Sequence, residues 1–124
     1  MPLKNLQKIN VHEKFTHIKG PWKPAIVGEL NNQNVKVVKV KGEFPWHFHE
    51  EEDELFYVIE GKLHIETRDQ VHILYKDEFI IIPRGIEHSP SAEEEALVML
   101  FEPKTTLNTG NIQNKFTHSD LQSV

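Results

Sequence analysis

The residue types best suited to chemistry gather between Gly42 and Gly61, in the segment GEFPWHFHEEEDELFYVIEG. His47 and His49 are two positions apart, and such positions on a β-strand point to one face, with Cα atoms about 6.6 Å apart. Two imidazoles at that separation can bind a single metal ion at about 2.1 Å each. The pair therefore predicts part of a metal site, provided that residues 46–49 form a strand.

A carboxylate and a third imidazole complete the predicted site. Glu54 follows the acidic residues 50–53 and opens a strand on which it shares one face with Phe56 and Val58, and we expect that face inside a barrel. His88 follows a Pro-x-Gly turn and arrives from a distant strand or loop. Three neutral imidazoles and one carboxylate suit a divalent transition metal, with Fe, Mn, Ni and Zn as candidates, and leave coordination positions open for substrate or water.

The rest of the predicted interior is apolar. Strand parity identifies three candidates to line the pocket: Phe56, Val58 and Met99. The acidic residues 50–53 indicate a solvated loop, whose negative field attracts cations and disfavours anionic ligands. The other histidines have no spacing that implicates them, and we expect them at the surface: His12, His17, His64, His72 and His118. With no second polar group assigned to the interior, oxygenation at the metal is favoured over reactions that need an acid–base pair.

Short strands must position these residues. The predicted strands are residues 35–42, 46–49, 55–60, 63–67, 71–75, 79–82 and 96–101. Residues 31–34 are a predicted turn, and residues 90–95 a predicted polar loop. No segment has the pattern of a long amphipathic helix, although one short helix near either terminus fits the sequence. Strands at intervals of roughly 8–12 residues indicate an all-β sandwich or barrel.

A single domain is predicted for the whole chain. Within its 124 residues (1–124) we expect a core barrel of about 26–102, an N-terminal arm of residues 1–25 and a C-terminal tail of residues 103–124. The 14 basic and 19 acidic residues give a formal net charge of −5, so we expect neither nucleic acid nor a membrane as a partner. The chain has no cysteine, no apolar signal segment and no run of membrane-spanning length. These features predict a cytoplasmic protein without disulfides.

The spacing of these histidines and the glutamate resembles the cupin superfamily, whose first motif is Gly-x5-His-x-His-x3,4-Glu-x6-Gly. The residues that match it, with four residues instead of five after the first glycine, are Gly42, His47, His49, Glu54 and Gly61. By overall layout the chain is most similar to the small single-domain cupins of the cupin 2 type. Many members of that group are labelled as similar to mannose-6-phosphate isomerase.

The second cupin motif is Gly-x5-Pro-x-Gly-x2-His-x3-Asn, and Pro83, Gly85 and His88 match it. Asp77 and Ala92 stand where that motif has its first glycine and its asparagine. The asparagine is not a metal ligand in the family, so the prediction of a metal site is unaffected. The resemblance implies an all-β, double-stranded β-helix (jelly-roll) barrel with little helix.

The resemblance also implies a set of metal ligands: His47, His49, Glu54 and His88. For function it implies first a small-molecule metalloenzyme of dioxygenase-like chemistry. The alternative is a non-catalytic module that binds or stores a small ligand, and a sugar isomerase or epimerase ranks third. The resemblance also implies a homodimer, since small cupins often pair through sheet edges or an exchanged N-terminal strand, and residues 1–25 could be such an arm. The other arrangement expected for the arm is that it folds back on its own barrel.

Overall fold

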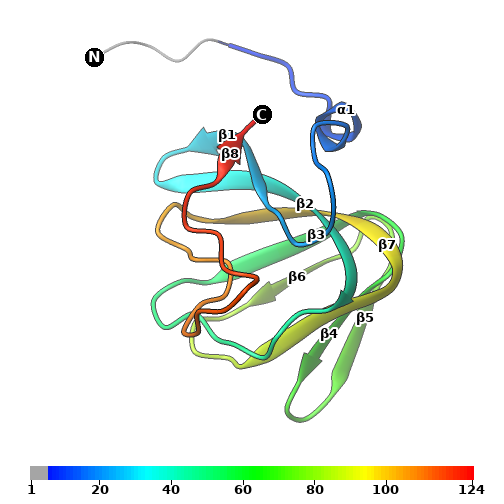
Figure 1. The fold of residues 1–124 in the computed structure, drawn as a ribbon, viewed down its shortest axis with the longest axis vertical. Coiled ribbons are helices and arrows are strands. Elements are labelled where there is room, and N and C mark those ends of the chain that lie inside the picture. Colours follow the sequence, from blue (N-terminus) through cyan, green and yellow to red (C-terminus); the bar gives the residue numbers. More distant parts are fainter. Residues whose placement is uncertain (1–5) are drawn as a thin grey trace.

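β-strands make up most of the structure, a computed structural model that describes residues 6–124 (Figure 1). The elements in chain order are α1 (Val11–Phe15), β1 (Ala25–Leu30), β2 (Gln33–Glu43), β3 (Glu54–Glu60), β4 (Leu63–Thr67), β5 (Val71–Leu74), β6 (Phe79–Ile82), β7 (His88–Pro103) and β8 (Gln122–Ser123). The strands form two curved layers around one interior, and the short helix lies outside them. The predicted all-β jelly-roll barrel with little helix is therefore confirmed.

The two layers share the long strands β2 and β7. β2 pairs with one edge of β7 along most of its length, while the other edge pairs first with β4 and then with β3. β6 extends the sheet beyond β3, β5 extends it beyond β4, and β1 and β8 extend it beyond β2. β7 therefore runs from one layer to the other. Side chains near both of its ends are buried in the interior.

Residues 90–95, which the sequence predicts as a polar loop, instead belong to β7. Ser91 and Ala92 pair with β2, and this ladder resumes at Ala96 after a shift of register between Val40 and Gly42. Residues 93–95 are exposed at this irregularity, so their carboxylates stay in water while the flanking backbone stays paired. The prediction is wrong because polar side chains mark an exposed face and do not exclude backbone pairing.

The predicted strand at residues 46–49 is reduced to a single antiparallel bridge between His47 and His88. Its other edge pairs with the C-terminal tail instead of a strand. The backbone N–H of Phe48 donates to Oδ1 of Asn111 at 2.8 Å, and its carbonyl accepts from the backbone N–H of Asn111 at 3.0 Å. The prediction of a strand is wrong because these hydrogen bonds go to an irregular segment.

Strand alternation divides the apolar side chains between the barrel interior and one outer face. The interior cluster is Trp22, Val38, Val40, Phe44, Phe56, Val58, Leu63, Ile65, Leu74, Ile82, Ala92, Ala96, Val98 and Leu100. A smaller cluster lies on the outer face around α1, built on Phe15, Ile18, Ala25 and Val37. In the described part of the chain, no helix is long and apolar enough to cross a membrane.

The described part of the predicted arm, residues 6–25, folds back on its own barrel. The backbone N–H of Trp22 donates to the carbonyl of Lys39 at 2.8 Å, and its indole Nε1 donates to the carbonyl of Lys41 at 2.8 Å. The Trp22 ring is buried in the interior cluster. This is the second of the two arrangements expected for the arm, and residues 1–5 lie outside the described residues.

Candidate metal centre

The structure brings the four predicted ligands together in one buried cluster. One ligand atom from each residue lies within 4.8 Å of the others, and the members of this histidine–glutamate cluster are His47, His49, Glu54 and His88. The first two come from the loop before β3, the glutamate is the first residue of β3, and the last histidine is the first residue of β7. Segments far apart in the sequence therefore meet at one end of the barrel.

Backbone hydrogen bonds hold these segments in place. His47 and His88 exchange both backbone hydrogen bonds, with N–H to carbonyl distances of 3.0 and 2.9 Å. The backbone N–H of Gly85 donates to the carbonyl of His49 at 2.7 Å, where Gly85 has a φ of 82°. Glycine tolerates this left-handed conformation without strain, so the Pro-x-Gly turn brings the chain back against both histidine-bearing segments.

The ring orientations of two histidines are fixed by hydrogen bonds at Nδ1. Nδ1 of His47 lies 2.9 Å from the carbonyl of Pro45, and Nδ1 of His88 lies 2.9 Å from the carbonyl of Ile86. A carbonyl can only accept, so each Nδ1 carries a proton, and in the neutral ring Nε2 is the nitrogen that can bind a metal. This carbonyl-to-imidazole arrangement is the usual support for a metal-binding histidine.

The atoms that face one another inside the cluster lack hydrogen-bond partners. Oε1 of Glu54 lies 3.3 Å from Nε2 of His49 and 3.4 Å from Nε2 of His88. Among the described residues, none of these three buried atoms has a partner in hydrogen-bond geometry. Leaving buried polar atoms unpaired costs free energy, and a shared cation would satisfy all of them. The donor set therefore fits a divalent transition metal.

The electrostatics of the cluster favour the protonation states that bind metal. Burial and the nearby His88 lower the pKa of His47 to about 4, so its imidazole is neutral at neutral pH. Burial alone would raise the pKa of Glu54, but the facing imidazoles of His49 and His88 lower this pKa well below its ordinary value. The cluster thus offers a carboxylate and a neutral His47 imidazole, the forms in which these groups bind metal.

A buried ion pair lies next to this cluster, and the sequence patterns did not reveal it. Nζ of Lys36 lies 2.8 Å from Oε1 of Glu102, and each side chain is only 2% exposed. The expectation of an otherwise apolar interior is therefore wrong. Parity was the available signal, because Lys36 alternates with Val38 on β2 and Glu102 alternates with Leu100 on β7, so all four point inward.

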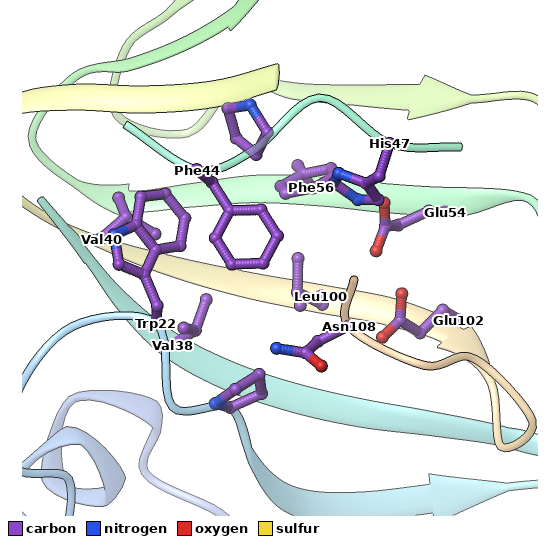
Figure 2. Close-up of a pocket in the computed structure, with 12 residues that line it drawn as sticks. Trp22, Val38, Val40, Phe44, His47, Glu54, Phe56, Leu100, Glu102 and Asn108 are labelled. Atoms are coloured by element: carbon purple, nitrogen blue, oxygen red, sulfur yellow. The ribbon is translucent and has the colours of Figure 1, made fainter. Parts of the chain in front are cut away.

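A cavity of about 40 Å³ borders both the cluster and the Lys36–Glu102 pair, whose carboxyl groups Glu54 and Glu102 lie close together (Figure 2). Its walls come from β2, β3 and β7, the loop between β2 and β3, the arm and the tail: Trp22, Pro24, Val38, Val40, Phe44, His47, Glu54, Phe56, Pro90, Leu100, Glu102 and Asn108. Figure 2 shows the carboxyl groups of Glu54 and Glu102 pointing toward one another, with apolar side chains filling the other end. The site is therefore polar at one end and apolar at the other.

Of the three predicted lining residues, only Phe56 borders this cavity. Val58 points inward as expected, but it is fully buried in the interior cluster away from the cavity. Met99 packs against the outer cluster around α1, and its neighbour Leu100 lines the cavity instead. The Met99 prediction is wrong because the parity of β7 directs Val98, Leu100 and Glu102 inward.

The C-terminal tail covers the cluster. Within this covering segment, residues 105–118, Gly110 has a φ of 56° and lies so close to the loop that an added Cβ would be 2.2 Å from the carbonyl oxygen of Phe48 and 3.1 Å from Cδ2 of His47. The ring of Phe116 packs edge-on against Phe44, with ring centroids 5.3 Å apart. The tail is thus irregular in backbone but packed against the metal-binding end of the barrel.

The two departures from the second motif have structural explanations. Asp77 has a φ of 67°, a left-handed conformation in which Asp is one of the better tolerated residues after glycine. Its Oδ1 accepts a hydrogen bond of 3.0 Å from the hydroxyl of Tyr57. Ala92 is buried in β7 and pairs with Gly42 of β2, so this position is part of the sheet.

The remaining sequence-based assignments fall outside the cluster. Residues 50–53 lie in an irregular and largely exposed loop, where the carboxylate of Asp53 accepts a hydrogen bond of 2.9 Å from the backbone N–H of Arg84. The other histidines are exposed or half-buried, and none of them belongs to a metal-binding group of described residues: His12, His17, His64, His72 and His118.

Comparison with solved structures gives close matches to the fold. A cupin-2 domain containing protein from Shewanella frigidimarina NCIMB 400 has 45% sequence identity and a TM-score of 0.76, over 77% of this chain and 94% of that chain. Protein NMB1881 from Neisseria meningitidis has 24% identity and a TM-score of 0.73, over 79% of this chain and 100% of that chain. At that identity the second match shows the fold alone.

Sequence comparison points the same way. The protein YdbB of Bacillus subtilis (strain 168) is 36% identical over 63 residues, which cover 50% of this chain and 56% of YdbB. The match thus spans only about half the length of this relative. The profile of the Cupin domain family matches residues 34–102, a stretch that contains the whole histidine–glutamate cluster and more than half of the chain. The chain belongs to the cupin family.

Proposed function

We propose that this chain is a metal-dependent enzyme for a small molecule, with dioxygenase-like chemistry as the first candidate. The observation that carries the proposal is the buried cluster whose ligand atoms lie within 4.8 Å of one another beside a cavity. The proposed metal ligands are His47, His49, Glu54 and His88. The proposed metal is a divalent transition ion, with Fe, Mn, Ni and Zn as candidates.

The residues around the cluster supply binding and orientation. An Fe or Mn ion bound there would supply Lewis acidity and redox chemistry with O₂. The carbonyls of Pro45 and Ile86 fix two of the imidazole rings, and the covering segment shields the cluster from bulk water. A cavity of about 40 Å³ holds about three water-sized groups, so the reacting part of the substrate must be small.

An isomerase- or epimerase-like reaction is the second candidate, and Glu102 is the observation that favours it. Such a reaction needs a side chain near the metal that takes a proton from the substrate and returns it. Glu102 borders the same cavity as Glu54 and is paired with Lys36 on the side away from it. The sequence-based preference for oxygenation depended on the absence of such a group.

We also propose, from the resemblance to other small cupins, that two copies of the chain form a homodimer. The exposed side chains of Phe79 and Ile81 on β6 lie at a sheet edge that a second copy would cover. Sedimentation velocity of the tag-free protein tests this proposal, and a monomer at micromolar concentration would contradict it.

Elemental analysis of protein purified without a metal-affinity tag tests the main proposal, with a stoichiometric transition metal expected. Oxygen uptake by the Fe-loaded protein, with catechols, thiols and diketones as substrates, tests the dioxygenase candidate. Deuterium exchange beside the carbonyl of hydroxyacetone in D₂O tests the isomerase candidate. A metal-free protein would overturn the proposal, whereas bound metal with neither reaction would favour the alternative of a ligand-binding or storage module.

A further inference from the structure

The Lys36–Glu102 pair leaves one carboxyl oxygen available to the cavity. Nζ of Lys36 is 2.8 Å from Oε1 of Glu102, whereas Oε2 is buried and receives no hydrogen bond from an N–H or hydroxyl donor among residues 6–124. The protein group that faces this carboxyl group is the carboxyl group of Glu54, which is itself an acceptor when ionised. Glu102 lines the cavity, and Figure 2 shows its carboxyl group pointing toward Glu54. An unpaired buried oxygen is costly, so this atom indicates a group that binds there.

Stability alone does not account for the pair. Removing two charges from water carries a large desolvation penalty, and replacing a buried ion pair by apolar residues of similar size is often neutral or stabilising. In this barrel such a replacement would only extend the apolar surface of Val38 and Leu100, which alternate with the pair on β2 and β7. The pair is therefore better explained by what it binds than by what it stabilises.

We propose that Glu102 binds a hydroxyl group of a neutral small molecule whose other oxygen is held at the histidine–glutamate cluster. This inference rests on the proposed metal-dependent function and names the substrate class of that site. A hydroxyl group suits Oε2 because it can both donate and accept a hydrogen bond. Lys36 is a positioning residue, since its contact with Oε1 fixes the direction in which Oε2 points.

The charges around the cavity disfavour charged ligand groups. An anionic carboxylate or phosphate would meet the carboxyl groups of Glu54 and Glu102 and the negative field of residues 50–53. An ammonium group at Glu102 would lie beside the ammonium of Lys36, which already occupies Oε1. A neutral hydroxyl group meets neither repulsion.

The apolar end of the cavity selects the rest of the molecule. The rings of Trp22 and Phe44 lie 4.7 Å apart between centroids, and Phe56 completes this wall. Trp22 adopts a φ of 63°, a rare conformation for a residue other than glycine, and strained residues of this kind cluster at binding sites. The expected ligand is thus a short hydroxy compound with a second oxygen and a small apolar part.

A pair of probes that differ by one methyl group tests the inference. The protein is loaded with Co²⁺, whose visible absorption reports on its ligands, and titrated with hydroxyacetone and with methoxyacetone. Methylation removes the hydroxyl donor and keeps the carbonyl. A hydrogen bond to a buried carboxyl group contributes about 1.5–3 kcal/mol, so we expect hydroxyacetone to bind roughly 10- to 100-fold more tightly.

The double variant Lys36→Met/Glu102→Leu removes the pair while keeping the interior filled. We expect it to bind Co²⁺ as the wild type does but to lose the preference for hydroxyacetone. Glu102→Gln serves as a second variant that keeps the side-chain volume, and we expect a preference between those of the wild type and the double variant. Unchanged preference in both variants would overturn the inference, and so would equal binding of the two probes by the wild type.

Cobalt content separates this inference from the proposed function. If the wild type binds no Co²⁺, the proposed function fails and the inference fails with it. If cobalt binds but the preference for the hydroxyl is absent, only the inference fails. If the double variant loses Co²⁺ affinity by more than about 10-fold, Glu102 acts on the metal itself, and its proposed role in binding a hydroxyl group is wrong.

Discussion

Two buried groups border the cavity, and they are neutralised in different ways. In the Lys36–Glu102 pair the carboxylate has its own cation, with Nζ at 2.8 Å from Oε1. In the histidine–glutamate cluster the Glu54 carboxylate faces imidazoles at 3.3 and 3.4 Å, and the atoms involved lack hydrogen-bond partners within the described chain. Lys36 neutralises the carboxylate of Glu102. The difference indicates that a bound metal cation would do the same for Glu54 in the cluster.

The two carboxyl groups also respond to burial in opposite ways. Burial and the facing Glu54 raise the pKa of Glu102 well above its ordinary value, although Lys36 opposes this change. Burial would likewise raise the pKa of Glu54, but His49 and His88 lower it well below its ordinary value. Two carboxyl groups that face one another in a site have pKa values that move apart. Glu54 therefore has the lower pKa of the two carboxyl groups, on the side where metal is expected.

The largest expected effect is loss of metal on truncation of the cluster. In His47→Ala and His88→Ala, removal of one imidazole from a four-residue donor set should lower metal affinity by at least about 100-fold, since changes to supporting residues alone cost 10- to 100-fold. Metal content after dialysis against a weak chelator measures the loss. Circular dichroism should show that the fold is retained, because the barrel is held by the interior cluster and its ladders.

His17→Ala is the matched control for these variants. His17 is exposed, and its imidazole contacts Glu13 at 3.2 Å, so its loss should leave metal content unchanged. Normal metal binding by both cluster variants would show that the assigned ligands are wrong. The cluster would then be a set of buried histidines without a cation, and the inferred contrast with the Lys36–Glu102 pair would be wrong.

The second effect concerns the pair and is a loss of stability. Lys36→Met leaves Glu102 buried without its cation, and breaking a buried pair from one side typically costs about 3–5 kcal/mol. Urea denaturation of the metal-free protein measures this cost. Lys36→Met/Glu102→Leu should recover most of it, because no charge is left behind. A single variant as stable as the wild type would show that Glu102 needs no cation, and that the two groups differ less than their geometry suggests.

The cluster could be predicted from the sequence and the pair could not, for a physical reason. The spacing of two residues identifies His47 and His49, and a Pro-x-Gly turn identifies His88. Short local patterns therefore contain these metal ligands. Lys36 and Glu102 are 66 positions apart and meet only because β2 and β7 pair in one register. That register places Asn34 opposite Glu102, which puts Lys36 diagonally across from it. Strand pairing, and not local pattern, creates this contact.

The errors at the edges of the fold have the same origin. The bounds of β3 and β4 agree with the sequence prediction nearly to the residue, because their apolar and polar positions alternate. The predictions for residues 90–95 and 46–49 are wrong because their hydrogen-bond partners lie in distant segments. The prediction for Met99 is wrong because only the pairing of β7 fixes which of its side chains point inward.

The third effect is a loss of stability in acid that comes from the cluster. The metal-free folded protein holds His47 at a pKa of about 4, against 6.5 for an ordinary histidine. Between these pH values the unfolded chain binds a proton that the folded chain does not, so stability should fall as pH drops from about 6.5 to about 4. At about 1.4 kcal/mol per pH unit, this contribution amounts to about 3 kcal/mol.

Urea denaturation at several pH values, in the presence of a chelator, measures this contribution. Glu102 contributes with the opposite sign to the pH dependence of stability. Its pKa is raised in the folded state, so its protonation stabilises the fold as pH drops. His47→Gln is the control, because it keeps a polar side chain of similar size but cannot titrate. If the variant and the wild type lose stability in parallel over this pH range, the protonation of His47 does not cause the loss. The electrostatic difference between the cluster and the Lys36–Glu102 pair would then be smaller than inferred.

The smallest expected effect is on the cover of the cluster. In Gly110→Ala the new Cβ would lie 2.2 Å from the carbonyl oxygen of Phe48, and the φ of 56° is unfavourable for alanine by about 1–2 kcal/mol. The covering segment must therefore shift away from His47, and we expect bound metal to be lost to a chelator several-fold faster. Gly28→Ala is the matched control, because no described atom lies within 4 Å of the position that its Cβ would take, and its φ is not left-handed.

The effect of Gly110→Ala should be confined to the cluster, because the nearest contacts of Gly110 are with Phe48 and His47 and not with the Lys36–Glu102 pair. The loss of stability caused by Lys36→Met should therefore be the same with and without Gly110→Ala. A faster loss of metal in both glycine variants, or in neither, would show that the covering segment does not protect the cluster.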